Sequence, residues 1–110
     1  MLPKPEPVRS EIYLDFLRKR PRCLINLPIC RQYRIEAAHT GSHGRGSKAH
    51  DIWALPLCAW HHRLGPDSYH ALGGEELFEQ KHKVDLKLEA LRLVALFITE
   101  SQNQNGVVRF

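Results

Sequence analysis

Cysteine, membrane-length apolar runs and internal repeats are all scarce or absent in this chain of 110 residues. The three cysteines, Cys23, Cys30 and Cys58, are an odd number, which fits a disulfide framework poorly. No apolar run is long enough to cross a bilayer, so no membrane association is expected. Residues 1–7 are rich in proline and charge and lack the apolar centre of a signal peptide. We therefore expect a cytoplasmic protein whose thiols stay reduced and available to a metal.

The length and composition fit one small globular domain. A chain of 110 residues rarely builds two cores, and 43% hydrophobic with 25% charged residues is ordinary for a folded protein. Such a core is modest in size, so a bound metal would help to stabilise it. The formal net charge of +4 suits a polyanionic partner, although many basic domains bind nothing acidic. Charge alone therefore does not assign a function.

A short helix is predicted near the start of the chain. Residues 11–20 have amphipathic spacing, and Ser10 before them is a plausible N-cap. The apolar side of this helix is expected to carry Ile12 and Phe16, flanked by Leu14 and Leu17. Its strongly basic end suits the helix dipole as a solvated face, and it would also suit contact with a phosphate. The solvated face is the simpler interpretation.

The middle of the chain predicts an irregular β-hairpin followed by a helix. Residues 32–38 predict one strand, and residues 52–58 predict a second that ends at Pro56. The segment 40–51 between them is a polar loop with three glycines. Residues 59–64 predict a helix that Gly-Pro then stops. With the helices on either side, this pattern indicates an α+β fold.

Two further helices are predicted after the hairpin. Residues 73–83 predict a short one with acidic residues in its first turn. Residues 84–100 predict a longer one that Asp85 can cap. Its apolar side is expected to carry Leu86, Ala90, Leu93, Leu96 and Phe97. The expected division is an extension with the basic helix (1–21), a core (22–88), a C-terminal helix packed on it (84–100) and a tail (101–110).

Seven histidines are many for a chain of this size, and their positions are informative. His39 closes the first predicted strand, while His61 and His62 open the helix after the second. Cys58 lies three residues before His61. Because a hairpin followed by a helix brings these groups together, we expect a shared site there. The histidines expected outside it are His43 and His50 in the loop and His82 on a solvent-facing surface.

Four sequence motifs follow one another through this region: EAAHT, KAHD, LPLCAWHH and a later His-x-x-Gly. Together they resemble the HNH, or ββα-metal, endonucleases of bacteria and phages, especially a phage-type subgroup. The similarity covers about residues 22–88. It implies two antiparallel strands and a helix around one divalent metal, and an enzyme that hydrolyses DNA phosphodiester bonds. Imidazole ligands suit several transition metals, so Mn²⁺, Ni²⁺ and Zn²⁺ are candidates that would compete with Mg²⁺.

The resemblance also assigns roles to individual residues. His39 would be the general base that takes a proton from the attacking water, which requires a neutral imidazole. His62 and His70 would be ligands of the catalytic metal. Asp51 stands where the family has its central Asn or Asp, and would brace the loop and orient the histidines. Thr40 would give further support.

Two of these assignments leave an alternative open. The distance in sequence from His62 to His70 departs from the family pattern, because Gly65-Pro66 breaks the predicted helix. His70 must therefore return on a second segment. Asp51 could equally be an ordinary Asx-turn residue with no part in catalysis.

A structural zinc is predicted from four further residues. Cys58-x-x-His61 supplies two ligands from the start of a helix, and Cys23 with Cys30 would complete a tetrahedral set, as in many proteins of the resembled family. The departure is the six residues between Cys23 and Cys30, where two are usual. A turn at Pro28 would bring the two thiols together. The alternative is three buried free cysteines.

Contacts with DNA are expected from the loop and from the helix start. Ser42, Arg45 and Lys48 lie among glycines that allow backbone amides to approach phosphate, and Arg63 follows the paired histidines. The alternative for the loop is a solvated segment without a ligand. Nothing resembles a major-groove recognition helix, so weak sequence preference is expected.

Other function classes compete with the nuclease. The chain could be a zinc-knuckle module that binds nucleic acid without cutting it, although such a module would not need His39. It could also be a recombination accessory protein with residual nuclease activity. Thiol chemistry is disfavoured because Cys30 and Cys58 have no paired base in an evident motif. For a nuclease this small, a protein partner that supplies specificity is also expected.

Overall fold

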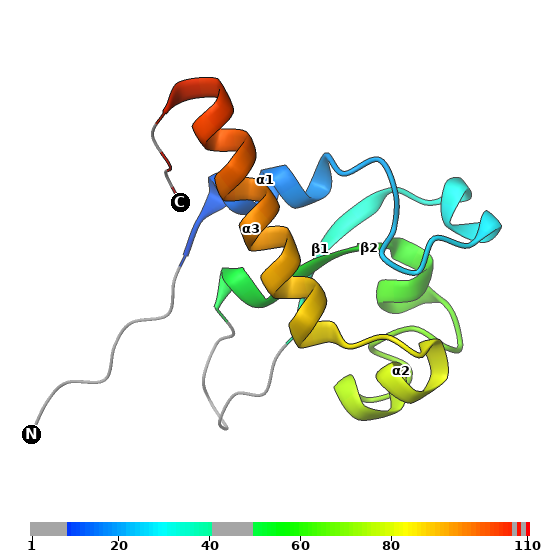
Figure 1. Cartoon of the computed structure of the whole chain (residues 1–110). Coiled ribbons are helices and arrows are strands. Elements are labelled where there is room, and N and C mark those ends of the chain that lie inside the picture. The colour runs from blue at the N-terminus through cyan, green and yellow to red at the C-terminus, as the bar shows by residue number, and fades with distance from the viewer. Residues whose placement is uncertain (1–8, 41–49, 107, 109) are drawn as a thin grey trace, which may run out of the picture.

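The structure is a computed structural model, and it describes residues 9–40, 50–106, 108 and 110. The elements in chain order are α1 (Glu11–Arg18), η1 (Pro28–Gln32), β1 (Ile35–His39), η2 (Asp51–Trp53), β2 (Ala54–Cys58), η3 (Trp60–Leu64), α2 (Glu75–His82) and α3 (Leu86–Asn105). Helices surround one two-stranded antiparallel sheet, so the predicted α+β class is confirmed (Figure 1). Among the described residues, no helix is long and apolar enough to cross a membrane.

The β-hairpin lies at the centre of the fold. β1 and β2 are antiparallel, with Ile35 opposite Cys58 and His39 opposite Ala54. All five residues of β2 are buried, and this strand continues past Pro56 instead of ending there as predicted. The Pro56 carbonyl accepts a hydrogen bond from the Leu24 N–H at 2.8 Å, so the polar groups of Pro56 face away from β1. The N–H that proline lacks therefore costs the ladder no bond.

The buried side of α1 differs from the predicted one. Tyr13, Leu14 and Leu17 are buried and Phe16 packs against them half-buried, whereas Ile12 is 55% exposed, so the expectation is wrong for Ile12. Spacing alone allowed either side, and the packing of α1 on the hairpin and on α3 selects the Tyr13 side (Figure 1). The predicted cap is confirmed, because the Ser10 hydroxyl accepts from the Tyr13 N–H at 3.1 Å.

α3 crosses α1 and the hairpin, and it is longer than predicted (Figure 1). Asp85 caps it by accepting from the Leu88 N–H at 3.0 Å, as expected. Leu86, Ala90 and Phe97 on its predicted apolar side are buried. The helix continues to Asn105, five residues beyond the predicted end, and Gly106 with φ of 69° ends it in a left-handed cap.

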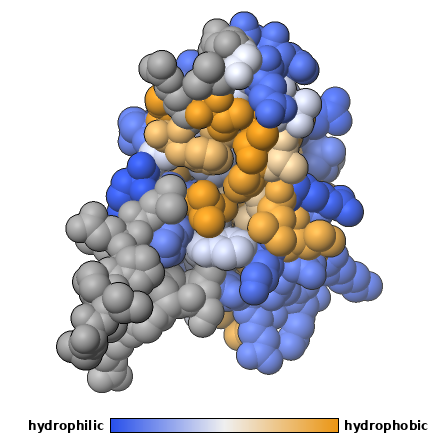
Figure 2. Space-filling view, turned by 60° about the vertical axis from the view of Figure 1, so that its left-hand side comes forward, coloured by the Kyte–Doolittle hydropathy of each residue, from blue (hydrophilic) through white to orange (hydrophobic). Residues whose placement is uncertain are grey.

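Two groups of buried side chains make up the core. One joins α1, β2 and α3 around Tyr13, whose ring meets that of Phe97 edge-on at 5.1 Å. The other surrounds the three cysteines and reaches Phe78 on α2. Figure 2 shows that apolar side chains also gather on one outer face, bordered by polar ones. The second buried group contains the three thiols that are candidate metal ligands.

Candidate metal centre and histidine site

Four buried side chains from separate elements meet at one point. They are Cys23 after α1, Cys30 in η1, Cys58 at the end of β2 and His61 in η3, and we call them the thiol–imidazole cluster. The four ligand atoms lie within 4.8 Å of one another, and none of the cysteines forms a disulfide. The Nδ1 atom of His61 lies 3.2 Å, 3.3 Å and 3.9 Å from the sulfurs of Cys30, Cys58 and Cys23.

The chemistry of this cluster fits a soft cation. Three sulfurs and one imidazole nitrogen form the donor set of a closed tetrahedral zinc site. Burial raises the pKa of the Cys58 thiol to about 12 and also raises the pKa of Cys30. A dication would supply the charge that lets such thiols ionise. The predicted ligand set is thus confirmed as a buried cluster that could hold a metal such as zinc.

Two turns bring Cys23 and Cys30 together across their unusual separation in sequence. Asn26 adopts a left-handed conformation with φ of 55°, which asparagine tolerates better than most residues. Pro28 then begins η1, as the turn predicted there requires. The Leu27 N–H donates to the sulfur of Cys30 at 3.3 Å, which fixes this thiol toward the cluster. Two turns therefore replace the usual short spacing.

The predicted helix after β2 is a single wide turn. In η3 the Gly65 N–H donates to the Trp60 carbonyl five residues earlier, at 2.8 Å. A Cβ atom on Gly65 would lie 2.7 Å from Trp60 Cε2, so only glycine fits against this indole. The turn directs His61 inward to the sulfurs, while His62 points to Glu36 on β1. His61 therefore belongs to the thiol–imidazole cluster, whereas the adjacent His62 belongs to a separate group of side chains around Glu36.

His39 at the end of β1 is held by a buried carboxylate. Its Nε2 lies 2.8 Å from Oδ1 of Asp51, and its side chain is 40% exposed. Asp51 also accepts from the Ser10 N–H at 2.6 Å and lies 3.5 Å from Arg9. These partners are remote in sequence, which favours a bracing role over a local Asx-turn. Thr40 donates to the Trp53 carbonyl at 2.6 Å and tightens the same end of the hairpin.

The charge of Asp51 is set by opposing effects. Burial disfavours its ionised form, but the hydrogen bonds from His39 and from the Ser10 N–H outweigh that cost. Together with the charges of His39 and Arg9, they lower the pKa of Asp51 below its usual value. The carboxylate is therefore ionised when it holds the imidazole.

His62 and His70 come together although the chain between them breaks. Their ring centroids are 4.8 Å apart with an interplanar angle of 84°. The segment after Gly65-Pro66 returns so that His70 faces His62 again. Among the residues that the structure describes, no group of three possible ligand side chains includes either of them. The catalytic metal at this pair remains a prediction.

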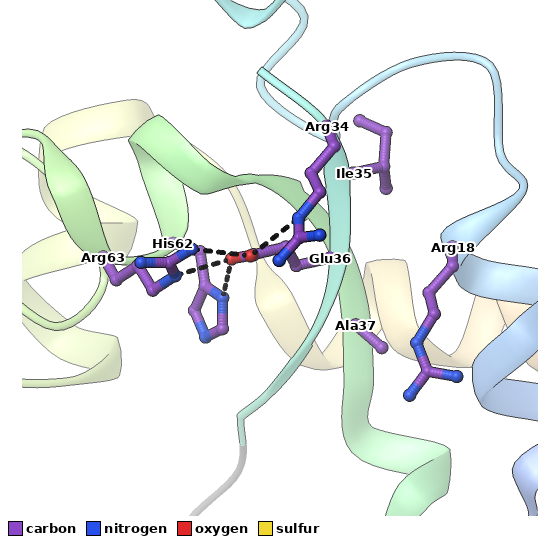
Figure 3. Close-up of a pocket in the computed structure, with 7 residues that line it drawn as sticks. All are labelled: Arg18, Arg34, Ile35, Glu36, Ala37, His62 and Arg63. Carbon is purple, nitrogen blue, oxygen red and sulfur yellow. Dashed lines mark hydrogen bonds and ion pairs between the residues drawn. The ribbon is translucent and has the colours of Figure 1, made fainter.

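The sequence did not lead us to predict Glu36, whose carboxylate contacts both His62 and Arg63. Its Oε1 lies 2.9 Å from Nδ1 of His62, and Arg63 donates to both of its oxygens at 3.0 Å (Figure 3). Hydrogen bonds from Arg63, then from His62, lower the pKa of Glu36 to about 2 although burial opposes this. Glu36 shares a strand face with the buried Ala38, which was a usable signal.

A basic hollow opens beside Glu36. It has a cavity volume of about 440 Å³, and the residues that line it are Arg18, Arg34, Ile35, Glu36, Ala37, His62 and Arg63. Figure 3 shows Arg34, His62 and Arg63 converging on Glu36, with Arg18 on the other side of β1. Of the predicted DNA contacts, Arg63 lies in this hollow. Ser42, Arg45 and Lys48 lie outside the described residues.

A second set of possible ligand side chains shares His61 with the thiol–imidazole cluster. One possible ligand atom from each of His61, Asp67 and His82 lies within 4.8 Å of the others. His82 was expected to face solvent, and that expectation is wrong. Its Nε2 lies 2.8 Å from the Asp67 carbonyl, and its ring packs on those of His61 and Phe78. The fold of residues 65–74 sets these contacts, and no spacing in the sequence signals them.

Comparison with known proteins gives a family. Neither the curated proteins nor the solved structures contain a match to this chain. One family model, described as "Protein of unknown function (DUF968)", matches residues 1–94. That match includes the hairpin, the thiol–imidazole cluster, His39, His62 and His70. The chain therefore belongs to the DUF968 family.

Proposed function

We propose that this protein is a metal-dependent endonuclease that hydrolyses phosphodiester bonds of DNA. In this proposal β1, β2 and η3 form a ββα-metal core in which the helix is reduced to one wide turn. The observation that carries it is the pair of His39 and Asp51, whose atoms lie 2.8 Å apart. A half-exposed imidazole held by a buried carboxylate is the arrangement expected of a general base.

The proposed reaction follows from that pair. With Nε2–H of His39 donating to Asp51, the lone pair on Nδ1 is free to accept a proton. A water oxygen attacks phosphorus, its proton passes to His39, and the bond from phosphorus to the 3′-oxygen breaks. Asp51 stabilises the imidazolium that forms and keeps the ring in one orientation. Arg9 and the Ser10 N–H hold Asp51 in turn.

His62 and His70 are the side chains proposed to hold the divalent ion. When bound, that ion would neutralise charge on the leaving 3′-oxygen. Glu36 occupies Nδ1 of His62, which leaves Nε2 as the coordinating atom. His62 lies beside Glu36 on β1, and His39 ends the same strand three residues later (Figure 3). We further propose that the base and the ligands share one site.

DNA is proposed as the substrate because of the positive side chains that line the hollow beside His62. Arg63 and Arg34 line the hollow beside His62, and guanidinium groups bind phosphate with good geometry. Ser42, Arg45 and Lys48 are proposed to contact the same backbone from the loop. Such contacts carry no base information, so a protein partner would have to supply specificity.

A plasmid-nicking assay tests the proposal. The full chain is incubated with supercoiled plasmid and each of Mg²⁺, Mn²⁺, Ni²⁺ and Zn²⁺, with and without EDTA. Wild type should nick only with added metal, and His39→Ala should lose at least about 100-fold in rate. Gln80→Ala, on an exposed position of α2, is the control and should cut normally. Equal cleavage by His39→Ala would refute the role of His39.

A zinc-knuckle module that binds nucleic acid without cutting is the second candidate. One observation favours it: among described residues, the thiol–imidazole cluster is a complete ligand set, whereas the His62–His70 pair is not. DNA binding by the zinc-loaded protein without any further added metal, together with no cleavage under any of the four metals, would select this function. In that case His39 and Asp51 would have a structural role.

A further inference from the structure

We propose that Asp67 and His82 are positioning residues of the thiol–imidazole cluster, and that Asp67 accepts the ring N–H of His61 when a metal is bound. Neither residue belongs to the four ligands. The inference depends on metal binding by the cluster and is independent of nuclease activity.

The first observation is an acceptor without a partner. Oδ1 of Asp67 is buried and has no hydrogen bond, one of only two such side-chain atoms among the described residues. Buried carboxylate oxygens are rarely left in this state. An oxygen of Asp67 and a ring nitrogen of His61 lie within 4.8 Å of one another. A donor from His61 is thus available nearby.

The second observation is the orientation of His61. Its Nδ1 faces all three sulfurs, so this nitrogen is the one that would bind the metal. A neutral histidine bound through Nδ1 must carry its proton on Nε2. Metal-bound histidines usually donate that second N–H to a carboxylate or a carbonyl. The unpaired oxygen of Asp67 would then accept the Nε2–H of His61.

His82 holds this arrangement from α2. Its Nε2–H donates to the main-chain carbonyl of Asp67 at 2.8 Å, which fixes the loop that carries the carboxylate. Its ring meets the His61 ring edge-on, with centroids 5.2 Å apart and planes at 90°. The ring of Phe78 packs on that of His82, with their centroids 4.4 Å apart. The helix therefore fixes both the carboxylate and the ligand ring.

The same three side chains could instead hold a second metal ion. Two existing contacts oppose that alternative. Nδ1 of His61 faces the sulfurs, and Nε2 of His82 is used by the Asp67 carbonyl. A second ion would require His61 to bridge two metals. The number of ions per chain distinguishes the two cases.

Zinc affinity of the full chain is the measurement, made by competition with a chromophoric chelator. Asp67→Ala should weaken zinc binding about 10–100-fold, the usual effect of losing such a partner. Asp67→Asn keeps an oxygen acceptor and should recover part of that loss. His82→Phe keeps the ring but not the hydrogen bond, and should weaken binding less than Asp67→Ala. Asp85→Ala is the control, because it removes a helix-capping carboxylate that is not among the possible metal ligands.

Cobalt substitution gives a second measurement that general destabilisation would not reproduce. Wild type and Asp67→Asn should both show intense thiolate-to-cobalt bands, but with shifted visible bands in the variant because His61 is held differently. Zinc affinity of Asp67→Ala equal to that of Asp85→Ala would overturn the proposal. Two tightly bound ions per wild-type chain would also overturn it. If Asp67→Ala does not fold, an unchanged zinc affinity and cobalt spectrum of Asp67→Asn would overturn it equally.

Discussion

The main-chain N–H of His70 donates to the main-chain carbonyl of His62 at 3.1 Å. One residue earlier, Tyr69 donates in the same way to His61 at 2.8 Å. The returning segment is therefore bonded to both the last ligand of the thiol–imidazole cluster and the first proposed ligand of the catalytic ion. Loss of the metal from the thiol–imidazole cluster should therefore disturb the His62–His70 pair through these two bonds.

Replacing Cys58 by serine should lower stability sharply, whereas replacing His62 by alanine should not. A structural metal contributes directly to folding because the unfolded chain holds no preformed site. Cys58→Ser should lower Tm by at least about 10 °C, since 1 kcal/mol corresponds to about 4–8 °C in a small domain. Calorimetry with elemental analysis checks this. If the wild-type protein contains no zinc and is no more stable than Cys58→Ser, the cysteines are ordinary core residues.

The contribution of Asp51 to stability should depend on pH in a defined direction. Its native pKa is lowered, so its stabilising effect is complete above the unfolded carboxyl pKa of about 3.9 and disappears as pH falls further. Asp51→Asn should cost about 1–3 kcal/mol at pH 7. Thermal unfolding from pH 7 to pH 3 should show the two proteins converging. A constant difference down to pH 3 would contradict this assignment.

Removing the charge of Glu36 should affect metal use more than folding. Glu36→Gln weakens the hold on Nδ1 of His62, so the metal concentration for half-maximal nicking should rise about 10-fold. Its ion pair with Arg63 is partly exposed and adds little stability, so Tm should change by only a few degrees. Glu76→Gln, at an exposed position of α2, is the control. An unchanged metal requirement would remove Glu36 from the site.

Gly65→Ala should destabilise the wide turn. The added methyl group would meet the Trp60 indole at 2.7 Å, and such overpacking costs about 1–3 kcal/mol. Trp60→Leu should restore much of the loss when it is combined with Gly65→Ala. Chemical denaturation of the single and double variants measures the coupling. Additive effects of the two changes would show that the contact does not control the turn.

Local chemistry was enough to predict some of this molecule. Ser10 and Asp85 cap their helices because a hydroxyl or carboxylate bonds an N–H three residues away, which needs no tertiary contact. Cys58 and His61 share a turn, so their pairing followed from spacing alone. Cys23 and Cys30 were harder, since a turn at Pro28 had to be assumed and the left-handed conformation of Asn26 was not predicted.

Features that depend on distant segments were not predictable in the same way. Ile12 is exposed because the packing of α1 is decided by the hairpin and by α3, not by the spacing of apolar residues. His82 turns inward because residues 65–74 place the Asp67 carbonyl in front of it. Glu36 has its partners on η3, which approaches β1 only after folding.

The opposite orientations of His61 and His62 limit how the length of this segment can vary during evolution. A deletion between Cys58 and His61 would change which histidine meets the sulfurs, and a length change between His62 and Gly65 would displace Gly65 from Trp60. Gly73 and Gly74 before α2 differ, because nothing lies within 4 Å of where their side chains would be. Length variation among relatives should therefore occur at Gly73-Gly74 and be absent from η3.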